Sequence, residues 1–135
     1  MKELADTGLI VALLSRNDPF HDWSLRAFRR HAPFQTCDAV VAEAASFFPT
    51  PVYVLKLLAR GDLILDSGFV LATELPRIFS LAEKYADRPM DLADACLVRM
   101  SELTVRSRVW TVDRSDFLTY RRNGRERVPC EFPLE

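Results

Sequence analysis

The acidic residues that could take part in metal or acid–base chemistry lie in four separated segments of this 135-residue chain. They are Asp6, Glu43, Asp94 with its neighbour Asp91, and Asp113 with its neighbour Asp116. Two carboxylates about 4 Å apart repel each other by roughly 4 kcal/mol at an effective dielectric near 20, so a cluster of them calls for a cation. All-oxygen ligands favour hard ions such as Mg²⁺ or Mn²⁺ over zinc or copper. If the fold brings these segments together, we expect metal-assisted hydrolysis of a phosphate ester.

Glu43 is the most informative of these acids, because it lies on an apolar helix face. Val40, Glu43, Ala44 and Phe47 follow the i, i+3, i+4, i+7 pattern and share one face of a helix predicted over residues 38–48. An ionised carboxylate buried there without a partner costs several kcal/mol, so it must be protonated, ion-paired or bound to a cation. The alternative to a metal ligand is an ion pair with an arginine.

Asp6 and the pair Asp91 and Asp94 each have a structural explanation beside the chemical one. Asp6 lies at the predicted carboxyl end of the first strand, where open α/β sheets place binding residues, but it could also cap the helix that follows. Asp91 is a natural helix N-cap, which leaves Asp94 free to reach a site. The reverse assignment of these two residues stays open.

A third group of candidates follows the best predicted strand, residues 109–112. Thr111 lies near the end of that strand and Asp113 comes directly after it, again at the expected carboxyl edge of a sheet. Asp116 could join them or merely cap the next helix.

The elements that must position these residues alternate between strands and helices. We predict strands at 4–5, 34–36, 63–65 and 109–112 and an edge strand after 128, with helices at 9–14, from 18 to about 27, 38–48, 52–59, 73–85, 91–103 and 116–122. Such alternation predicts an α/β fold with a central, mostly parallel sheet of four to five strands. Ligands are then expected at the carboxyl ends of the strands.

Composition narrows the class of protein. The length suits one domain over residues 1–135, and the net charge of −1 restricts any nucleic-acid contact to a local basic patch. The sequence has no apolar run long enough for a membrane span and no signal-peptide core, so we expect a cytoplasmic protein. Its three cysteines form neither a disulfide framework nor a zinc pattern, and a catalytic triad and a Gly-rich phosphate loop are absent from the sequence.

Four motifs together resemble those of PIN domains. LADTGLIVALL resembles their first strand and helix, and CDAVVAEAASFF resembles the segment that bears their acidic helix residue. MDLADACLVRMSE and VWTVDRSDF resemble their last two acidic motifs. No motif is specific alone, but the order matches over nearly the whole chain, and the chain is most similar to VapC-type toxin ribonucleases. The resemblance implies a PIN-like three-layer α/β/α fold.

The resemblance also implies roles for the acids. It gives metal-binding and catalytic roles to Asp6, Glu43, Asp94 and Asp113, with Mg²⁺ or Mn²⁺ as cofactor; the accessory candidates are Thr7, Thr111, Asp91 and Asp116. The activity it implies is metal-dependent endoribonuclease cleavage by the toxin of a type II toxin–antitoxin pair. The alternative is a catalytically silent PIN-like module that binds RNA or protein.

The same resemblance implies an RNA substrate, a small antitoxin partner and a homodimer. We expect Arg121, Arg122 and Arg125 to hold the RNA backbone. The arginine clusters at 26–30 and 106–108 are explained at least as well by a solvated charged face. The prolines in FFPTPVYVL interrupt a region where many relatives continue a helix, which affects the expected shape of the RNA groove and of the antitoxin-binding surface.

Overall fold

The computed structural model describes residues 1–88 and 90–134 and has a five-stranded parallel sheet at its centre. The strands run in the order β3-β2-β1-β4-β7, where β1 is Lys2–Ala5, β2 Phe34–Thr36, β3 Leu63–Leu65, β4 Ser107–Trp110 and β7 Cys130–Glu131. In the register Leu4 lies opposite both Gln35 and Val109. Because all five strands are parallel, their carboxyl ends meet at one edge, as predicted.

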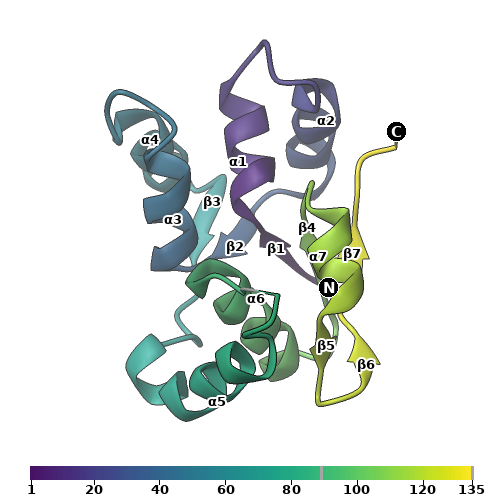
Figure 1. The fold of residues 1–135 in the computed structure, drawn as a ribbon. Helices are drawn as coiled ribbons and strands as arrows, with labels where there is room; N and C mark the ends of the chain where they lie inside the picture. Colours follow the sequence, from purple (N-terminus) through teal and green to yellow (C-terminus); the bar gives the residue numbers. More distant parts are fainter. Residues whose placement is uncertain (89, 135) are drawn as a thin grey trace.

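Helices cover both faces of this sheet (Figure 1). They are α1 (Thr7–Leu14), α2 (His21–His31), α3 (Asp38–Ala45), α4 (Val52–Arg60), α5 (Leu71–Lys84), α6 (Leu92–Leu103) and α7 (Arg114–Thr119). In the view of Figure 1, α1, α2 and α4 lie above the sheet, and α5 and α6 lie below it. The arrangement is the predicted three-layer α/β/α fold.

Helix α6 is the most deeply packed helix and carries part of the site. Its residues from Ala93 to Val98 are all buried. Cys96 and Met100 form part of the core as predicted, but Leu92 and Leu103 from the same expected stripe are 51% and 43% exposed. The buried part of this face is therefore shorter than the predicted stripe.

The C-terminal part differs most from the prediction. The last helix ends at Thr119 instead of continuing to Arg122, and a small antiparallel hairpin follows, formed by β5 (Arg121–Arg122) and β6 (Glu126–Arg127). At its turn Asn123 and Gly124 have positive φ angles of 52° and 85°. Asn and Gly tolerate this left-handed backbone best, so they close the hairpin, whereas the helix already ends where the backbone of Tyr120 becomes extended.

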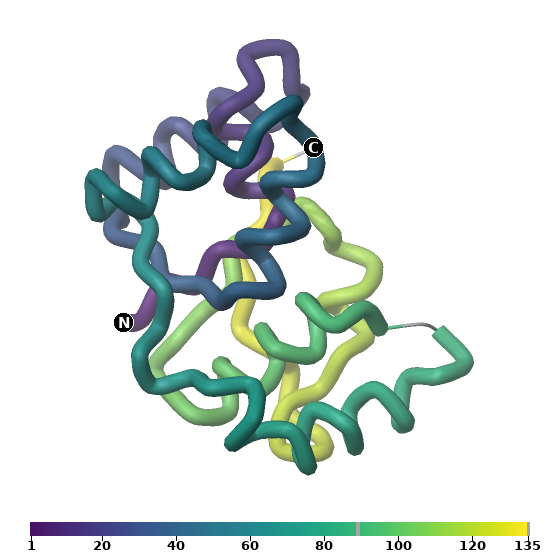
Figure 2. The backbone as a smooth tube through the Cα atoms, turned by 90° about the vertical axis from the view of Figure 1, so that its left-hand side faces the viewer, coloured from purple at the N-terminus to yellow at the C-terminus, as the bar shows by residue number. Residues whose placement is uncertain are grey.

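Among the other helix ends, two differ from the prediction by three residues. Helix α3 ends at Ala45 rather than at Phe48, because the chain turns ahead of Pro49 and Pro51. Helix α2 begins at His21 rather than at Asp18, whose carboxylate instead accepts the Phe20 N–H at 2.8 Å in a turn. In Figure 2 the helical coils of the first 60 residues, purple to blue, gather in the upper part of the view, and those of α5 and α6, teal to green, lie in the lower part.

No helix in the described ranges is long and apolar enough to cross a membrane.

Candidate metal centre

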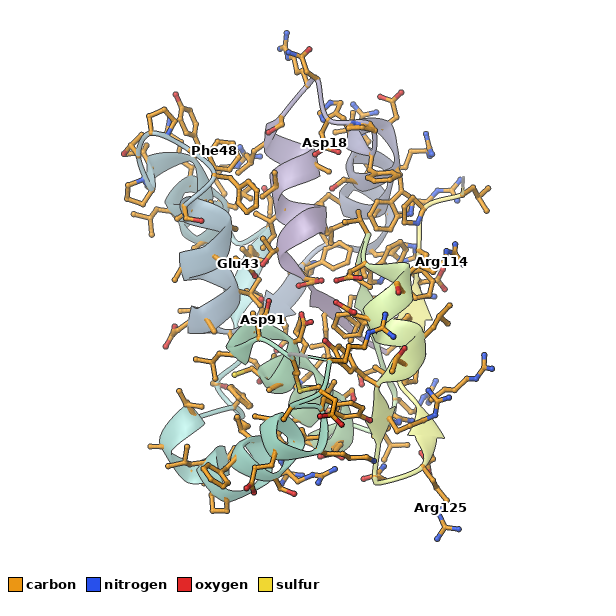
Figure 3. The ribbon with its side chains drawn as sticks, viewed as in Figure 1. Asp18, Glu43, Phe48, Asp91, Arg114 and Arg125 are labelled. Carbon is orange, nitrogen blue, oxygen red and sulfur yellow. The ribbon has the colours of Figure 1, made fainter. Side chains whose placement is uncertain are left out.

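The predicted acids meet in one cavity at the carboxyl edge of the sheet. A cavity of about 330 Å³ is lined by Asp6, Glu43, Asp91, Asp94 and Asp113, together with Thr7. Figure 3 shows Glu43 and Asp91 facing the space between α1, α3 and α6. The structure therefore brings together acids that are far apart in the sequence.

Asp6 fulfils both functions considered from the sequence. It follows β1 and caps α1, where its Oδ1 accepts the Thr7 N–H at 2.7 Å. Its Oδ2 accepts the Thr111 hydroxyl at 2.6 Å. The pKa of Asp6 is raised to about 6, chiefly by burial and also by the charges of Glu43 and Asp91, while these two hydrogen bonds act to lower it.

Asp94 points into the site, and Asp91 caps the helix. The Asp91 side chain accepts the Asp94 N–H at 2.7 Å, the N-cap geometry of α6. One turn further in, Asp94 is buried, and its Oδ2 accepts the Tyr120 hydroxyl at 2.7 Å. Burial, followed by the charge of Asp6, raises the pKa of Asp94 to about 8. Asp91 nevertheless lines the same cavity at its exposed rim.

Asp113 and Asp116 complete a cluster of three carboxylates with Asp94. One oxygen of each residue lies within 4.8 Å of the others. Asp113 rather than Asp116 caps α7, since its Oδ1 accepts the Asp116 N–H at 3.2 Å. Burial and the neighbouring Asp116 raise the pKa of Asp113. Three acids this close together repel one another unless a cation lies between them.

Glu43 lies across the cavity on α3 and is half-buried rather than buried. The predicted apolar helix face around Glu43 is not fully buried. Phe47, the last residue of that face, is 63% exposed and lies beyond the end of α3. Its Oε1 accepts the Thr7 hydroxyl at 2.5 Å, so its partner is this threonine and not the arginine considered as the alternative.

Three neighbours of the acids were not predicted. Tyr120 supplies the hydroxyl to Asp94, and Arg88 makes an ion pair with Asp116 at 3.1 Å. Both contacts join residues more than 25 positions apart, so no local pattern identifies them. Gly8 is a third, since a Cβ there would lie 2.4 Å from Cγ2 of Val112. Its position right after Asp6 and Thr7 in DTG is a usable signal for a close approach.

The three arginines expected to hold RNA do not act as a group. Arg122 is buried, and its guanidinium donates to the carbonyls of Ser101 and Val105. The Arg121 guanidinium donates to carbonyls at the end of α7. Arg125 is exposed, but Figure 3 shows it at the far end of the molecule from Glu43 and Asp91. The buried position of Arg122 removes it from any RNA surface.

The donor set fits a hard divalent ion. Every side chain in the cluster offers carboxylate oxygen, which Mg²⁺ and Mn²⁺ prefer. The pKa values of Asp6, Asp94 and Asp113 are raised, first by burial and then by neighbouring carboxylates, so a bound cation would stabilise their charged forms. Among the described residues Arg88 makes an ion pair with a member of the cluster, and the member that it pairs with is Asp116, at the cluster's edge.

Comparison with solved structures finds a toxin with the same fold over most of this chain. The crystal structure of VapC20 of Mycobacterium tuberculosis, described as a sarcin-ricin loop cleaving toxin, matches with a TM-score of 0.66. The match covers 80% of this chain and 87% of that chain at 14% identity. The chain has a PIN-like fold. No family model and no curated protein matches the sequence, so the fold is what the comparisons add.

Proposed function

We propose that this chain is a metal-dependent endoribonuclease of the VapC type, with Asp6, Glu43, Asp94 and Asp113 as its metal-binding and catalytic acids. The observation that carries the proposal is the acid cluster at the carboxyl edge of the sheet, where two pKa values are raised to about 6 and about 8. A structural ion-pair network would lower such values instead. The same fold in a toxin that cleaves RNA supports the choice of substrate class.

Within this proposal Asp94 and Asp113 would hold the ion, with Asp116 as an accessory ligand, because one oxygen of each lies within 4.8 Å of the others; Asp6 lies next to Asp94. A bound Mg²⁺ or Mn²⁺ supplies Lewis acidity and lowers the pKa of a bound water. Thr111 and Tyr120 fix one oxygen each of Asp6 and Asp94, which orients these acids. Glu43 lies across the cavity, and its Oε2 is the oxygen that we expect to accept a proton from the attacking water.

The substrate and partners of this protein belong to the same proposal. Since the structural match is described as cleaving the sarcin-ricin loop, a ribosomal RNA stem-loop is a reasonable first substrate to test. We also propose a small antitoxin that binds over the acidic cavity, and a homodimer.

The test is cleavage of a panel of RNA stem-loops, single-stranded RNA and DNA with manganese, magnesium or EDTA. We expect RNA cleavage that requires the ion and falls at least about 100-fold in Asp94→Asn, because losing several kcal/mol of charge stabilisation costs that much rate. Asp38→Asn, the same change at an exposed position outside the cavity, should cleave normally. Folded wild type that cleaves no RNA and shows no manganese-dependent rise in its unfolding midpoint would contradict the proposal and favour a non-cleaving binding module.

A further inference from the structure

A second groove begins where the acidic cavity ends. It lies between α2 on one side and β4, β7 and the C-terminal tail on the other, and encloses about 640 Å³. Pro19 and Phe20 line both this groove and the acidic cavity, so these two residues form the lip between them. A volume of this size is within the range of small-ligand sites.

Aromatic rings form the wall of this groove. Trp110 is 6% exposed and is fixed from behind, since its Nε1 donates to Glu3 at 3.2 Å and Arg108 lies over its ring. The Trp23 ring lies 5.9 Å from it and is only half-buried. Phe20 is half-buried as well. The groove therefore offers partly exposed aromatic rings, one of which packs against Trp110, a ring that contacts Glu3 and Arg108.

Two cations line the same groove without partners. Arg26 and Arg30 are exposed and one helical turn apart on α2, and neither makes an ion pair with any described residue. The acids on the groove are Asp22, which is exposed, and Glu131, which pairs with Arg108 at 3.0 Å. The net unpaired charge along α2 is therefore positive.

We propose that this groove is a binding site for single-stranded RNA, which holds the nucleotide next to the cleaved phosphodiester; this rests on the proposed nuclease function. The strand crosses the lip at Pro19 and Phe20, its base stacks on Trp23, and Arg26 and Arg30 contact its phosphates. Exposed aromatic faces beside unpaired arginines are the features by which proteins hold single strands with little sequence preference. The site also gives a function to Arg26 and Arg30, which the sequence analysis explained at least as well by a solvated charged face.

Intrinsic fluorescence can test this binding without cleavage. The chain has two tryptophans, Trp23 and Trp110, and both line the groove. We expect an eight-nucleotide single-stranded RNA of mixed sequence, added in EDTA, to quench this fluorescence saturably. The double variant Arg26→Gln/Arg30→Gln should bind about tenfold more weakly, and its log affinity should fall less steeply with log salt, by about 1.4 in slope for two lost phosphate contacts.

The matched control is Arg16→Gln/Arg29→Gln. These arginines are also exposed, and Arg29 lies on the same helix, but neither lines the groove. The control removes the same charge but leaves the groove intact. It should therefore bind RNA within about twofold of wild type. A second variant, Trp23→Leu, keeps an apolar side chain but loses the stacking surface; with labelled RNA and anisotropy as the readout, it should bind at least fivefold more weakly.

The outcomes separate this inference from the nuclease proposal. Quenching that the groove variants weaken and the control does not supports the groove site, even if no substrate is cleaved. Wild type that cleaves RNA with manganese, while the groove variants bind and cleave as the control does, overturns the groove site and leaves the nuclease intact. Quenching that both double variants weaken equally would also overturn it, since binding would then follow total charge and not the groove.

Discussion

Helix α6 carries a buried carboxylate at each end, and the two have opposite surroundings. At its last turn Glu102 accepts bonds from Arg77 at 2.9 and 2.6 Å and from Arg99 at 3.2 Å, and its pKa is lowered despite burial. In its first turn Asp94 accepts one bond from the Tyr120 hydroxyl, and its pKa is raised to about 8. Both side chains are largely excluded from solvent, so the opposite directions of the two shifts come from their partners and from the charges around them.

This contrast separates structural acids from acids that need a ligand. A buried carboxylate in an ion pair is the ordinary solution, and the chain uses it at Glu102. The acids around Asp94 are given hydroxyl donors instead, from Thr7, Thr111 and Tyr120. Hydroxyls orient a carboxylate but do not neutralise it. The charge at this end must therefore be balanced from outside the chain, which is the physical basis for the metal site.

The largest effect on folding is expected at the paired end. Glu102→Gln should lower the free energy of unfolding by about 2–3 kcal/mol, because Arg77 and Arg99 lose charge-assisted hydrogen bonds. Urea unfolding measures this change, and Glu83→Gln, an exposed glutamate on α5, is the control. Manganese should still raise the midpoint of Glu102→Gln. A variant as stable as wild type would mean that the network is not the structural ion pair described.

The two ends should also respond to pH with opposite signs. The pKa of Asp94 is raised from 3.8 to about 8 and that of Asp6 to about 6 by folding. Between about pH 4 and 6 for Asp6, and between about pH 4 and 8 for Asp94, the unfolded chain has released the proton and the folded chain has not, so metal-free stability falls as pH rises. We expect the unfolding midpoint in EDTA to fall by several degrees over this window, and to fall less in Asp94→Asn.

Glu102 provides the opposite case in the same experiment. Its folded pKa lies below 4.5, so its contribution is present above that value and is lost as pH falls through the folded pKa. In Glu102→Gln the unfolding midpoint should therefore change less with pH below about pH 4.5. Its fall between pH 4.5 and 8 should stay as in the wild type. If Asp94→Asn kept the wild-type slope between pH 4.5 and 8, the raised pKa of Asp94 would not be the cause of that slope.

Much of the fold and the site followed from the sequence, because hydrophobic periodicity determines the alternation of strands and helices. Once the strands are parallel, acids that follow β1 and β4 must meet at one edge, which placed Asp6 and Asp113 correctly. The cap geometry of Asp91 also follows from local sequence.

What failed depended on packing between distant segments. Arg122 was expected at the surface, but β5 turns its side chain toward carbonyls of the α6 end. The hairpin that causes this had a local signal in Asn123-Gly124, but its strands are two residues long and carry no periodicity. The exposed side of Glu43 depended on where α3 ends, which the helix pattern alone did not fix.

The smallest predicted effect tests whether the hydroxyl donors serve the acid cluster. Tyr120 is fully buried and packs against Tyr85 and Phe117, with ring centroids 5.2 Å away in each case. Tyr120→Phe keeps this packing and removes only the bond to Asp94. We expect manganese affinity to fall about tenfold, as is usual when a group that orients a metal ligand is lost. A manganese titration of the unfolding midpoint measures it.

Tyr85→Phe is the matched control, because it removes a hydroxyl from the same aromatic pair. The Tyr85 hydroxyl accepts the Arg121 N–H at 2.8 Å and touches no acid of the cluster. Both variants should lose about 1 kcal/mol of metal-free stability, the usual value of one hydrogen bond. Only Tyr120→Phe should also lose manganese affinity. Equal loss of affinity in both would mean that aromatic packing, and not the hydroxyl, holds Asp94 in place, and that the contrast between the two ends of α6 rests on shape more than on hydrogen bonding.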